Sequence, residues 1–232
     1  LPESLTEVKN ISKTLRATGF TTRMFTDFEG TEEAFLQTGT QSRAAQQHKK
    51  GSPRILHLAT HGYFFPDPNT DSLTQGKQSG MERHIPYRAS DNPFIRSGLL
   101  LSGCEQAWRT GSPASSKLAD GILTAADIAA LDLSGTELTV LSACETGLGD
   151  VESNEGVYGL QRAFKIAGSR YLIMSLWKVE DMATMELMTD FYAKWLDPDK
   201  PASIPDAFRA AQAKLREKYR DPFYWAGFVL VE

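Results

Sequence analysis

Short apolar runs of strand length alternate with amphipathic stretches along most of this chain of 232 residues. The clearest runs cover residues 54–60, 97–101, 137–143, 171–176 and 228–231. The stretches between them carry apolar residues at helical spacing, and one such set is Leu5, Val8, Ile11 and Leu15. Strands that alternate with helices predict an α/β fold, in which helices cover both faces of a mostly parallel sheet.

Local signals predict where the helices begin and where the chain forms a loop. A capping-box pattern at Ser4 predicts the start of the first helix. Further helices are expected to begin at Thr31, Thr124, Val157, Asp181 and Ser203. One more strand is expected over residues 21–26. Residues 66–93 are rich in Asp, Asn, Ser, Gly and Pro, which predicts a long surface loop inserted between core segments.

The composition argues against several classes of function. A formal net charge of -4 disfavours a protein whose binding is dominated by nucleic-acid phosphates. No apolar run approaches the roughly 18 residues that a membrane span needs. With only two cysteines, Cys104 and Cys144, a reducing compartment such as the cytoplasm is expected. Because the chain begins with Leu1 rather than Met, we expect it to be a piece of a longer protein.

Three segments whose side chains could carry chemistry directly follow apolar strands. His61 follows the run 54–60, Cys144 follows the run 137–143, and residues 177–181 follow the run 171–176. In open α/β sheets the binding crevice forms beyond the carboxyl ends of the strands. If these strands are parallel neighbours, the three segments converge at one edge of the sheet.

A histidine and a cysteine that converge in this way can form the dyad of a cysteine hydrolase. A thiol with an ordinary pKa of about 8.5 is only slightly ionised at neutral pH, so it gains from a nearby imidazole. The same imidazole can later protonate the leaving amine. The spacing alone leaves a structural interpretation open, because a single cysteine at a strand end is often a small buried residue.

The other histidines and the second cysteine have plainer interpretations. His57 lies inside an apolar strand, and we expect it to be a structural residue with satisfied hydrogen bonds. His48 and His84 lie in polar segments and are expected on the surface, and Cys104 is expected to be structural. The four His and two Cys show no metal-ligand spacing and the chain has no phosphate-binding loop, so neither a metal nor a cofactor is expected.

At these residues the chain resembles a CHAT domain, a caspase-like module usually found behind tetratricopeptide repeats and grouped with caspases, separase and gingipains. The matching segments are residues 57–62 (HLATHG), 99–103 (LLLSG), 120–128 (DGILTAADI), 141–147 (LSACETG), 175–184 (SLWKVEDMAT) and 221–228 (DPFYWAGF). They occur in the family's order over nearly the whole chain, and one departure is the insertion at 66–93. The resemblance implies one domain over residues 1–232 with the caspase-hemoglobinase α/β/α sandwich.

The resemblance also implies roles for individual residues. Cys144 would be the nucleophile and His61 the general acid and base. The backbone amides of Gly62 and Cys144 would form the oxyanion hole. A peptide substrate would lie as an extended strand beside the sheet.

The residue that selects the substrate side chain is less sharply defined. Separase-like relatives place an acidic residue after a Trp-x-Val-x-Asp segment, which points to Asp181 as the partner of a basic P1 side chain. Glu180 and Asp150 are weaker candidates. Asp181 also stands where the N-cap of the following helix is expected, which is a purely structural role.

We therefore expect a cysteine endopeptidase that cleaves protein substrates through a thioester acyl-enzyme, regulated by an upstream tetratricopeptide-type domain or partner. Two alternatives remain open: a catalytically silent caspase-like interaction module, and a cysteine hydrolase of a non-peptide amide or ester. Arg83 and Arg88 in the inserted loop would suit self-cleavage by an enzyme that prefers Arg.

Overall fold

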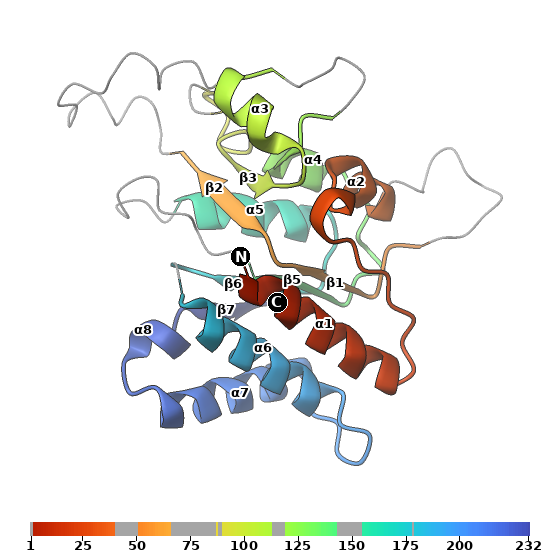
Figure 1. Cartoon of the computed structure of the whole chain (residues 1–232), viewed down its shortest axis with the longest axis vertical. Coiled ribbons are helices and arrows are strands. Elements are labelled where there is room, and N and C mark those ends of the chain that lie inside the picture. Colours follow the sequence, from red (N-terminus) through yellow and green to blue (C-terminus); the bar gives the residue numbers. More distant parts are fainter. Residues whose placement is uncertain are drawn as a thin grey trace.

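A central sheet of four strands organises the molecule (Figure 1). The computed structural model describes residues 2–39, 51–65, 87, 90–112, 119–142, 155–177 and 179–232. In the order of the sheet, the strands are β1 (Ile55–Leu58), β5 (Leu138–Leu141), β6 (Tyr171–Ser175) and β7 (Phe228–Val231). The first three are parallel, and β7 runs antiparallel at the edge. The expected mostly parallel sheet is thus confirmed.

Helices cover both faces of this sheet, as the alternating pattern predicts. One face carries α1 (Pro2–Ala17), α6 (Asp181–Trp195), α7 (Ile204–Lys218) and α8 (Pro222–Trp225), and the other carries α4 (Ala125–Ala129) and α5 (Glu155–Ile166) (Figure 1). Alternate strand residues serve the two faces, because side chains along a strand point to opposite sides. Val140 packs with α1, α6 and α7, whereas Leu141 packs with α4 and α5.

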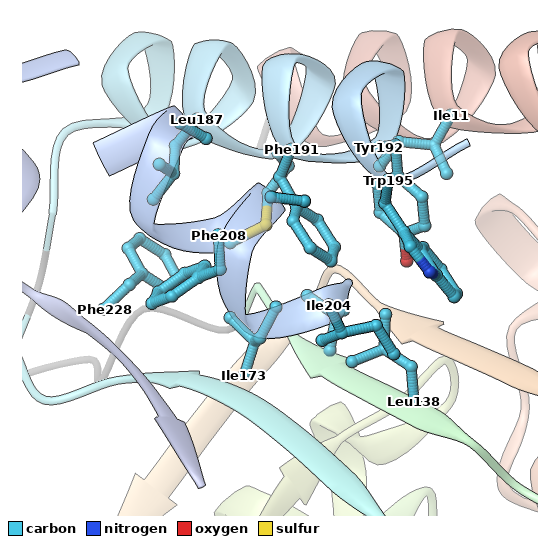
Figure 2. Packing of buried hydrophobic residues seen from close by; sticks show 14 of the residues in the cluster. Ile11, Leu138, Ile173, Leu187, Phe191, Tyr192, Trp195, Ile204, Phe208 and Phe228 are labelled. Carbon is cyan, nitrogen blue, oxygen red and sulfur yellow. The ribbon is translucent and has the colours of Figure 1, made fainter. Parts of the chain in front are cut away.

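Aromatic rings fill the core between the sheet, α6 and α7 (Figure 2). Phe191 is fully buried, stacks on Trp195 with ring centroids 5.8 Å apart, and meets Tyr192 and Phe208 edge-on. Leu138 of β5 and Ile173 of β6 belong to the same cluster. These close aromatic contacts pack α6 firmly against the two central strands, β5 and β6.

A second, antiparallel sheet was not foreseen from the sequence. It has the order β2-β3-β4, with β2 (His61–Phe64), β3 (Ser97–Leu100) and β4 (Ile122–Thr124). Ala59 and Thr60 alone separate β2 from β1, and the Thr60 hydroxyl donates to the Leu100 carbonyl oxygen at 2.5 Å. Because only two residues link β1 to β2, the sequence shows a single apolar run and does not indicate that the chain passes from one sheet to the other.

Two expectations at the N-terminal end were wrong. No strand forms over residues 21–26. Instead Thr22 contacts α1, because its hydroxyl oxygen accepts from Arg16 Nε at 2.6 Å and lies 3.0 Å from Ser12 Oγ. The 3-10 helix η1 (Asp27–Glu29) follows. In addition α1 begins at Pro2, so Glu7 lies in the body of the helix rather than in a capping box at Ser4.

Other local signals were confirmed. Thr124 and Asp127 form the expected capping box at the start of α4, and the Ser203 side chain caps α7. The short helix expected near Thr31 is α2 (Glu32–Gly39). α3 (Cys104–Thr110) was not expected. Most of the inserted loop, including Arg83 and Arg88, lies outside the described residues. None of the helices in the described part of the chain combines the length and apolar character that a membrane span requires.

Glu32 at the start of α2 makes the stability of the fold depend on pH. Burial, with the nearby charge of Asp120, raises the pKa of Glu32 from 4.5 to about 7, although its carboxylate accepts from Gly121 N at 3.0 Å. Between these two pH values the folded state binds more protons than the unfolded state, so the free energy of unfolding falls as pH rises.

We expect Glu32→Gln to remove this dependence, because glutamine keeps an oxygen for Gly121 N but cannot ionise. The variant should be more stable than the wild type by about 1–3 kcal/mol at pH 8 and nearly equal to it at pH 4. Denaturant unfolding at the two pH values measures this difference. A variant that is less stable than the wild type at pH 8 would contradict the prediction.

Candidate active site

The carboxyl ends of β1 and β5 lie side by side. The register pairs Leu58 with Leu141, and Ser142 N donates to the Leu58 carbonyl oxygen at 2.8 Å. His61 comes three residues after Leu58, and Cys144 comes two residues after Ser142. The segments that lead to His61 and to Cys144 therefore begin at the same edge of the sheet.

His61 is the first residue of β2 and is exposed. Its position is fixed by the antiparallel register, which pairs it with Leu100 of β3. The bond from Thr60 to the Leu100 carbonyl holds the preceding turn. The structure thus places His61 at the surface, at the start of a short paired strand.

Gly62 lies opposite Leu99 in the same ladder and is buried. A Cβ added there would approach the Gly98 carbonyl oxygen only to 3.7 Å, an ordinary contact. Packing among the described residues therefore does not demand glycine at this position.

Cys144 itself lies outside the described residues, as do Asp150 and Lys178. What the structure does define is Ser142, from which the segment with Cys144 departs. Ser142 is buried, and its backbone and side chain are both hydrogen bonded. The starting point of the cysteine segment is therefore well fixed.

The third segment follows β6, on the side of β5 away from β1. Here one expectation was wrong, because Asp181 is not the N-cap of α6. Glu180 has an extended backbone and its carboxylate accepts from Ala183 N at 2.9 Å, so Glu180 caps the helix. Residue statistics favour Asp over Glu as a cap, which is why the sequence alone indicated the wrong residue.

Asp181 is half-buried in the first turn of α6. Within the part of the chain that the structure covers, its carboxylate has no hydrogen-bond or ion-pair partner. Glu180 is engaged in the cap, so Asp181 is the acidic group of this pair that is not committed to the helix.

Two segments that carry the family resemblance contact each other directly. Leu176 N donates to the Gly227 carbonyl oxygen at 2.7 Å, and Trp177 Nε1 donates to the Phe223 carbonyl oxygen at 3.1 Å. A Cβ at Gly227 would lie 2.4 Å from Val179 Cγ2, so only glycine allows this approach. The 221–228 segment thereby supports the chain that leads from β6 into α6.

His57 and Cys104 behave as structural residues, whereas His48 and His84 lie outside the described residues. Both ring nitrogens of His57 are hydrogen bonded, one to Glu7 and one to Tyr192, which confirms its structural interpretation. Cys104 starts α3 and packs against the aromatic cluster of Tyr63 and Trp108. Burial raises the pKa of the Cys104 thiol, so little reactive thiolate forms there at neutral pH. No group of three or more potential metal-ligand side chains occurs among the residues that can be described.

Sequence reasoning missed Glu7 and Ser142, which form a buried polar cluster with His57 and Tyr192 below the site. A signal for Glu7 was present, because it precedes Ile11 and Leu15 at intervals of four residues. It therefore lies on the buried stripe of α1, where a carboxylate needs a specific partner. Ser142 gave no such signal.

A mostly parallel sheet flanked by helices, with a histidine segment and a cysteine segment leaving adjacent strands, defines a caspase-like α/β protein. The chain belongs to the CHAT domain family, whose family model matches residues 1–232. It is also similar to tetratricopeptide repeat protein 28 of Mus musculus, with 35% identity over 186 residues, or 76% of this chain. The protein of that name from Homo sapiens is 33% identical over 111 residues, or 47% of this chain. The matches span only 7% and 4% of these relatives, respectively.

Proposed function

We propose that this chain is a cysteine endopeptidase domain of the caspase-like type. The observation that carries the proposal is the parallel pairing of β1 with β5, with Leu58 beside Leu141. Leu58 and Leu141 each precede a candidate residue, His61 or Cys144, by three positions, so the pairing supports a shared site at one edge of the sheet, as a nucleophile and its base require.

In the proposed reaction, His61 takes the proton of the Cys144 thiol, and the sulfur attacks the carbonyl carbon of the scissile peptide bond. The backbone amides of Gly62 and Cys144 donate to the oxyanion that develops. The C–N bond then breaks, and His61 returns the proton to the leaving amine. Water hydrolyses the thioester and regenerates the thiol. The thiol must stay reduced, so the proposal includes a reducing compartment such as the cytoplasm.

The substrate is proposed to be an extended protein segment that lies beside the sheet. Asp181 would pair with a basic P1 side chain, since Glu180 already caps α6. We also propose that residues 1–232 are one domain of a longer protein, regulated by an upstream tetratricopeptide-type domain or its partner. The names of the two relatives support that context.

The test is hydrolysis of a fluorogenic peptide library with varied P1 residues by the full-length protein, alongside matched esters and non-peptide amides. Release of fluorophore from peptides supports the endopeptidase and identifies the P1 residue. Turnover of esters or non-peptide amides alone would support a hydrolase of another substrate class. No turnover, together with no modification of Cys144 by a peptidyl acyloxymethyl ketone, would support a silent interaction module.

For Asp181 we expect a change of specificity without a change of stability. Asp181→Asn should lower kcat/KM for peptides with Arg at P1 by about 10²-fold, because the guanidinium would lose its charged partner. Peptides with a neutral P1 residue should be affected by less than about two-fold. Kinetics on matched peptide pairs measure both values.

Glu180→Ala is the matched control for this prediction. It removes the helix cap and should destabilise the fold by about 1 kcal/mol, yet leave the preference between Arg and neutral P1 residues unchanged. An unaltered Arg preference in Asp181→Asn would rule out Asp181 as the P1 partner.

A further inference from the structure

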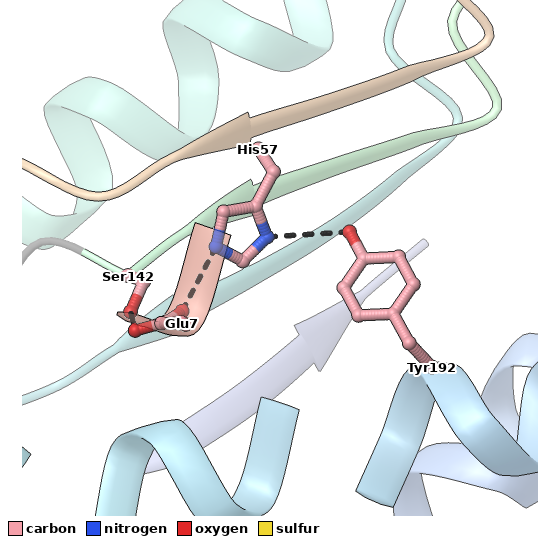
Figure 3. Close-up of polar contacts among 4 residues, drawn as sticks. All are labelled: Glu7, His57, Ser142 and Tyr192. Carbon is pink, nitrogen blue, oxygen red and sulfur yellow. Dashed lines mark hydrogen bonds and ion pairs between the residues drawn. The ribbon is translucent and has the colours of Figure 1, made fainter. Parts of the chain in front are cut away.

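A buried polar cluster joins four elements directly beneath the end of β5 (Figure 3). Glu7 of α1 contacts His57 of β1 through Oε1, at 2.8 Å from Nε2. The other carboxylate oxygen accepts from Ser142 Oγ at 3.1 Å. Tyr192 of α6 completes the cluster, with its hydroxyl 3.2 Å from His57 Nδ1. Glu7 is only 3% exposed and Ser142 4%, so water does not satisfy these groups.

The donors and acceptors of the cluster match one another. A carboxylate can only accept, so the proton on the Glu7 side belongs to His57 Nε2, and Ser142 donates its hydroxyl proton. The Tyr192 hydroxyl can either donate to or accept from His57 Nδ1, so it fits either state of the ring. Both carboxylate oxygens of Glu7 are thereby occupied, one by the strand with His57 and one by Ser142.

A cluster of this kind is not needed merely to hold α1 on the sheet. Well-packed apolar residues of similar volume serve as well as a buried ionic group in many cores. Ile11 and Leu15 on the same stripe of α1 already pack into the apolar cluster with α6 and α7. In addition to packing, Glu7 fixes the side chain of Ser142 at the end of β5.

That residue is the one from which the segment with Cys144 departs. Ser142 is held through its backbone amide by Leu58 of β1 and through its hydroxyl by Glu7 of α1. Two independent bonds on one residue restrict both its position and its rotation. A misplacement of about 1 Å at a reacting group can reduce catalysis by about 10²-fold, so such a restraint bears on the chemistry.

We propose that Glu7 is a positioning residue, which acts through Ser142 to hold the end of β5 and thereby orient Cys144. The proposal rests on the function proposed above, in which Cys144 is the nucleophile. Glu7 does not contact the substrate in this account. Its effect reaches the reaction only through the hydroxyl of Ser142, which predicts that the two residues behave alike when replaced.

The test compares four variants of the full-length protein, each in a Cys104→Ser background. Glu7→Leu and Ser142→Ala each break the bond between α1 and the end of β5. Glu7→Gln keeps it, because the amide oxygen can accept from Ser142 while the amide nitrogen donates to the other tautomer of His57. Tyr192→Phe is the control, since it removes a hydroxyl from the same cluster without touching Ser142.

We expect Glu7→Leu and Ser142→Ala to lower kcat for a peptide substrate by about ten-fold or more, with KM changed by less than about two-fold. Glu7→Gln should restore most of kcat. Tyr192→Phe should lower the Tm but leave kcat near the wild-type value. Unchanged kcat in a folded Ser142→Ala variant would overturn the proposal, as would an equal loss of kcat in Tyr192→Phe.

The alkylation rate of Cys144 by iodoacetamide, followed by mass spectrometry, separates this proposal from the proposed function. Slower alkylation in both Glu7→Leu and Ser142→Ala, and not in Tyr192→Phe, supports positioning even if the wild type cleaves no peptide. Equal alkylation rates in all variants would overturn it. If Glu7→Leu does not fold, Ser142→Ala decides the outcome by itself.

Discussion

Cys144→Ala is expected to reduce kcat for peptide cleavage by at least about 10³-fold, because removal of the sulfur removes the acyl-enzyme route. The structure gives this expectation a physical basis. Ser142 N donates a hydrogen bond to the Leu58 carbonyl oxygen, so the cysteine segment starts beside the strand that leads to His61. Alanine at position 144 differs from cysteine by one sulfur atom. The measurement is steady-state turnover of the best peptide found in the library.

The matched control is Cys104→Ala, which replaces the other cysteine of the chain. Cys104 is half-buried beside Tyr63 and Trp108, and the raised pKa of its thiol keeps it protonated at neutral pH. Turnover should therefore stay within about two-fold of the wild type. Loss of turnover in Cys104→Ala but not in Cys144→Ala would show that Cys104 is the nucleophile and would contradict the proposal.

His61→Ala is expected to lower kcat by about 10²–10⁴-fold, the range that a positioned general acid and base contributes. His61 is exposed at the start of β2 and its backbone is fixed by pairing with Leu100. Its replacement should therefore leave the fold intact, and thermal unfolding should show a Tm close to that of the wild type.

The pH dependence of Cys144 alkylation distinguishes the chemical role of His61 from a structural one. At pH 7 the variant should be alkylated more slowly, since no imidazole assists formation of the thiolate. Above about pH 9.5 an ordinary thiol ionises without help, and the difference should shrink. Turnover should remain low at this pH, because the leaving amine still lacks its acid. An equal deficit in alkylation at all pH values would indicate that the site is distorted instead.

The centre of the main sheet could be predicted because β5 and β6 are buried on both faces. The strands β5 and β6 read as continuous apolar runs, and the amphipathic helices between them require parallel crossovers. The capping box of Thr124 and the cap at Ser203 could also be predicted, since both follow from side chains that bond the adjacent backbone. These features depend on residues close together in sequence.

Features that depend on distant residues could not be predicted in this way. The second sheet requires β2 to pair with β3, which lies beyond the inserted loop. The segment 21–26 has the composition of a strand, but its partner is the side-chain surface of α1 rather than a strand. Glu180 caps α6 although Asp181 is the residue type favoured for that role. Tertiary contacts decided the first two cases and overrode a local preference. The cap by Glu180 is instead a local contact with Ala183 N that residue preferences do not favour.

The candidate site shows the same division. His61 and Gly62 were predicted from their place at a strand end, and the structure places both in β2, which begins three residues after Leu58, the partner of Leu141. Their catalytic roles stay predictions. The cluster beneath them was missed, because Glu7 and Ser142 are separated by 135 residues and meet only in the folded chain. The helical spacing of Glu7, Ile11 and Leu15 indicates that Glu7 is buried, but it does not indicate which residue Glu7 contacts.

The most direct test of the proposed peptidase is covalent labelling of the full-length protein with a peptidyl acyloxymethyl ketone, followed by peptide mapping. The reagent carries the P1 residue preferred in the library and captures a nucleophilic thiol that can attack a bound peptide. The account predicts a single adduct on Cys144, with Cys104 unmodified. An adduct on Cys104, or an unmodified Cys144 in a sample that cleaves the matching peptide, would contradict it.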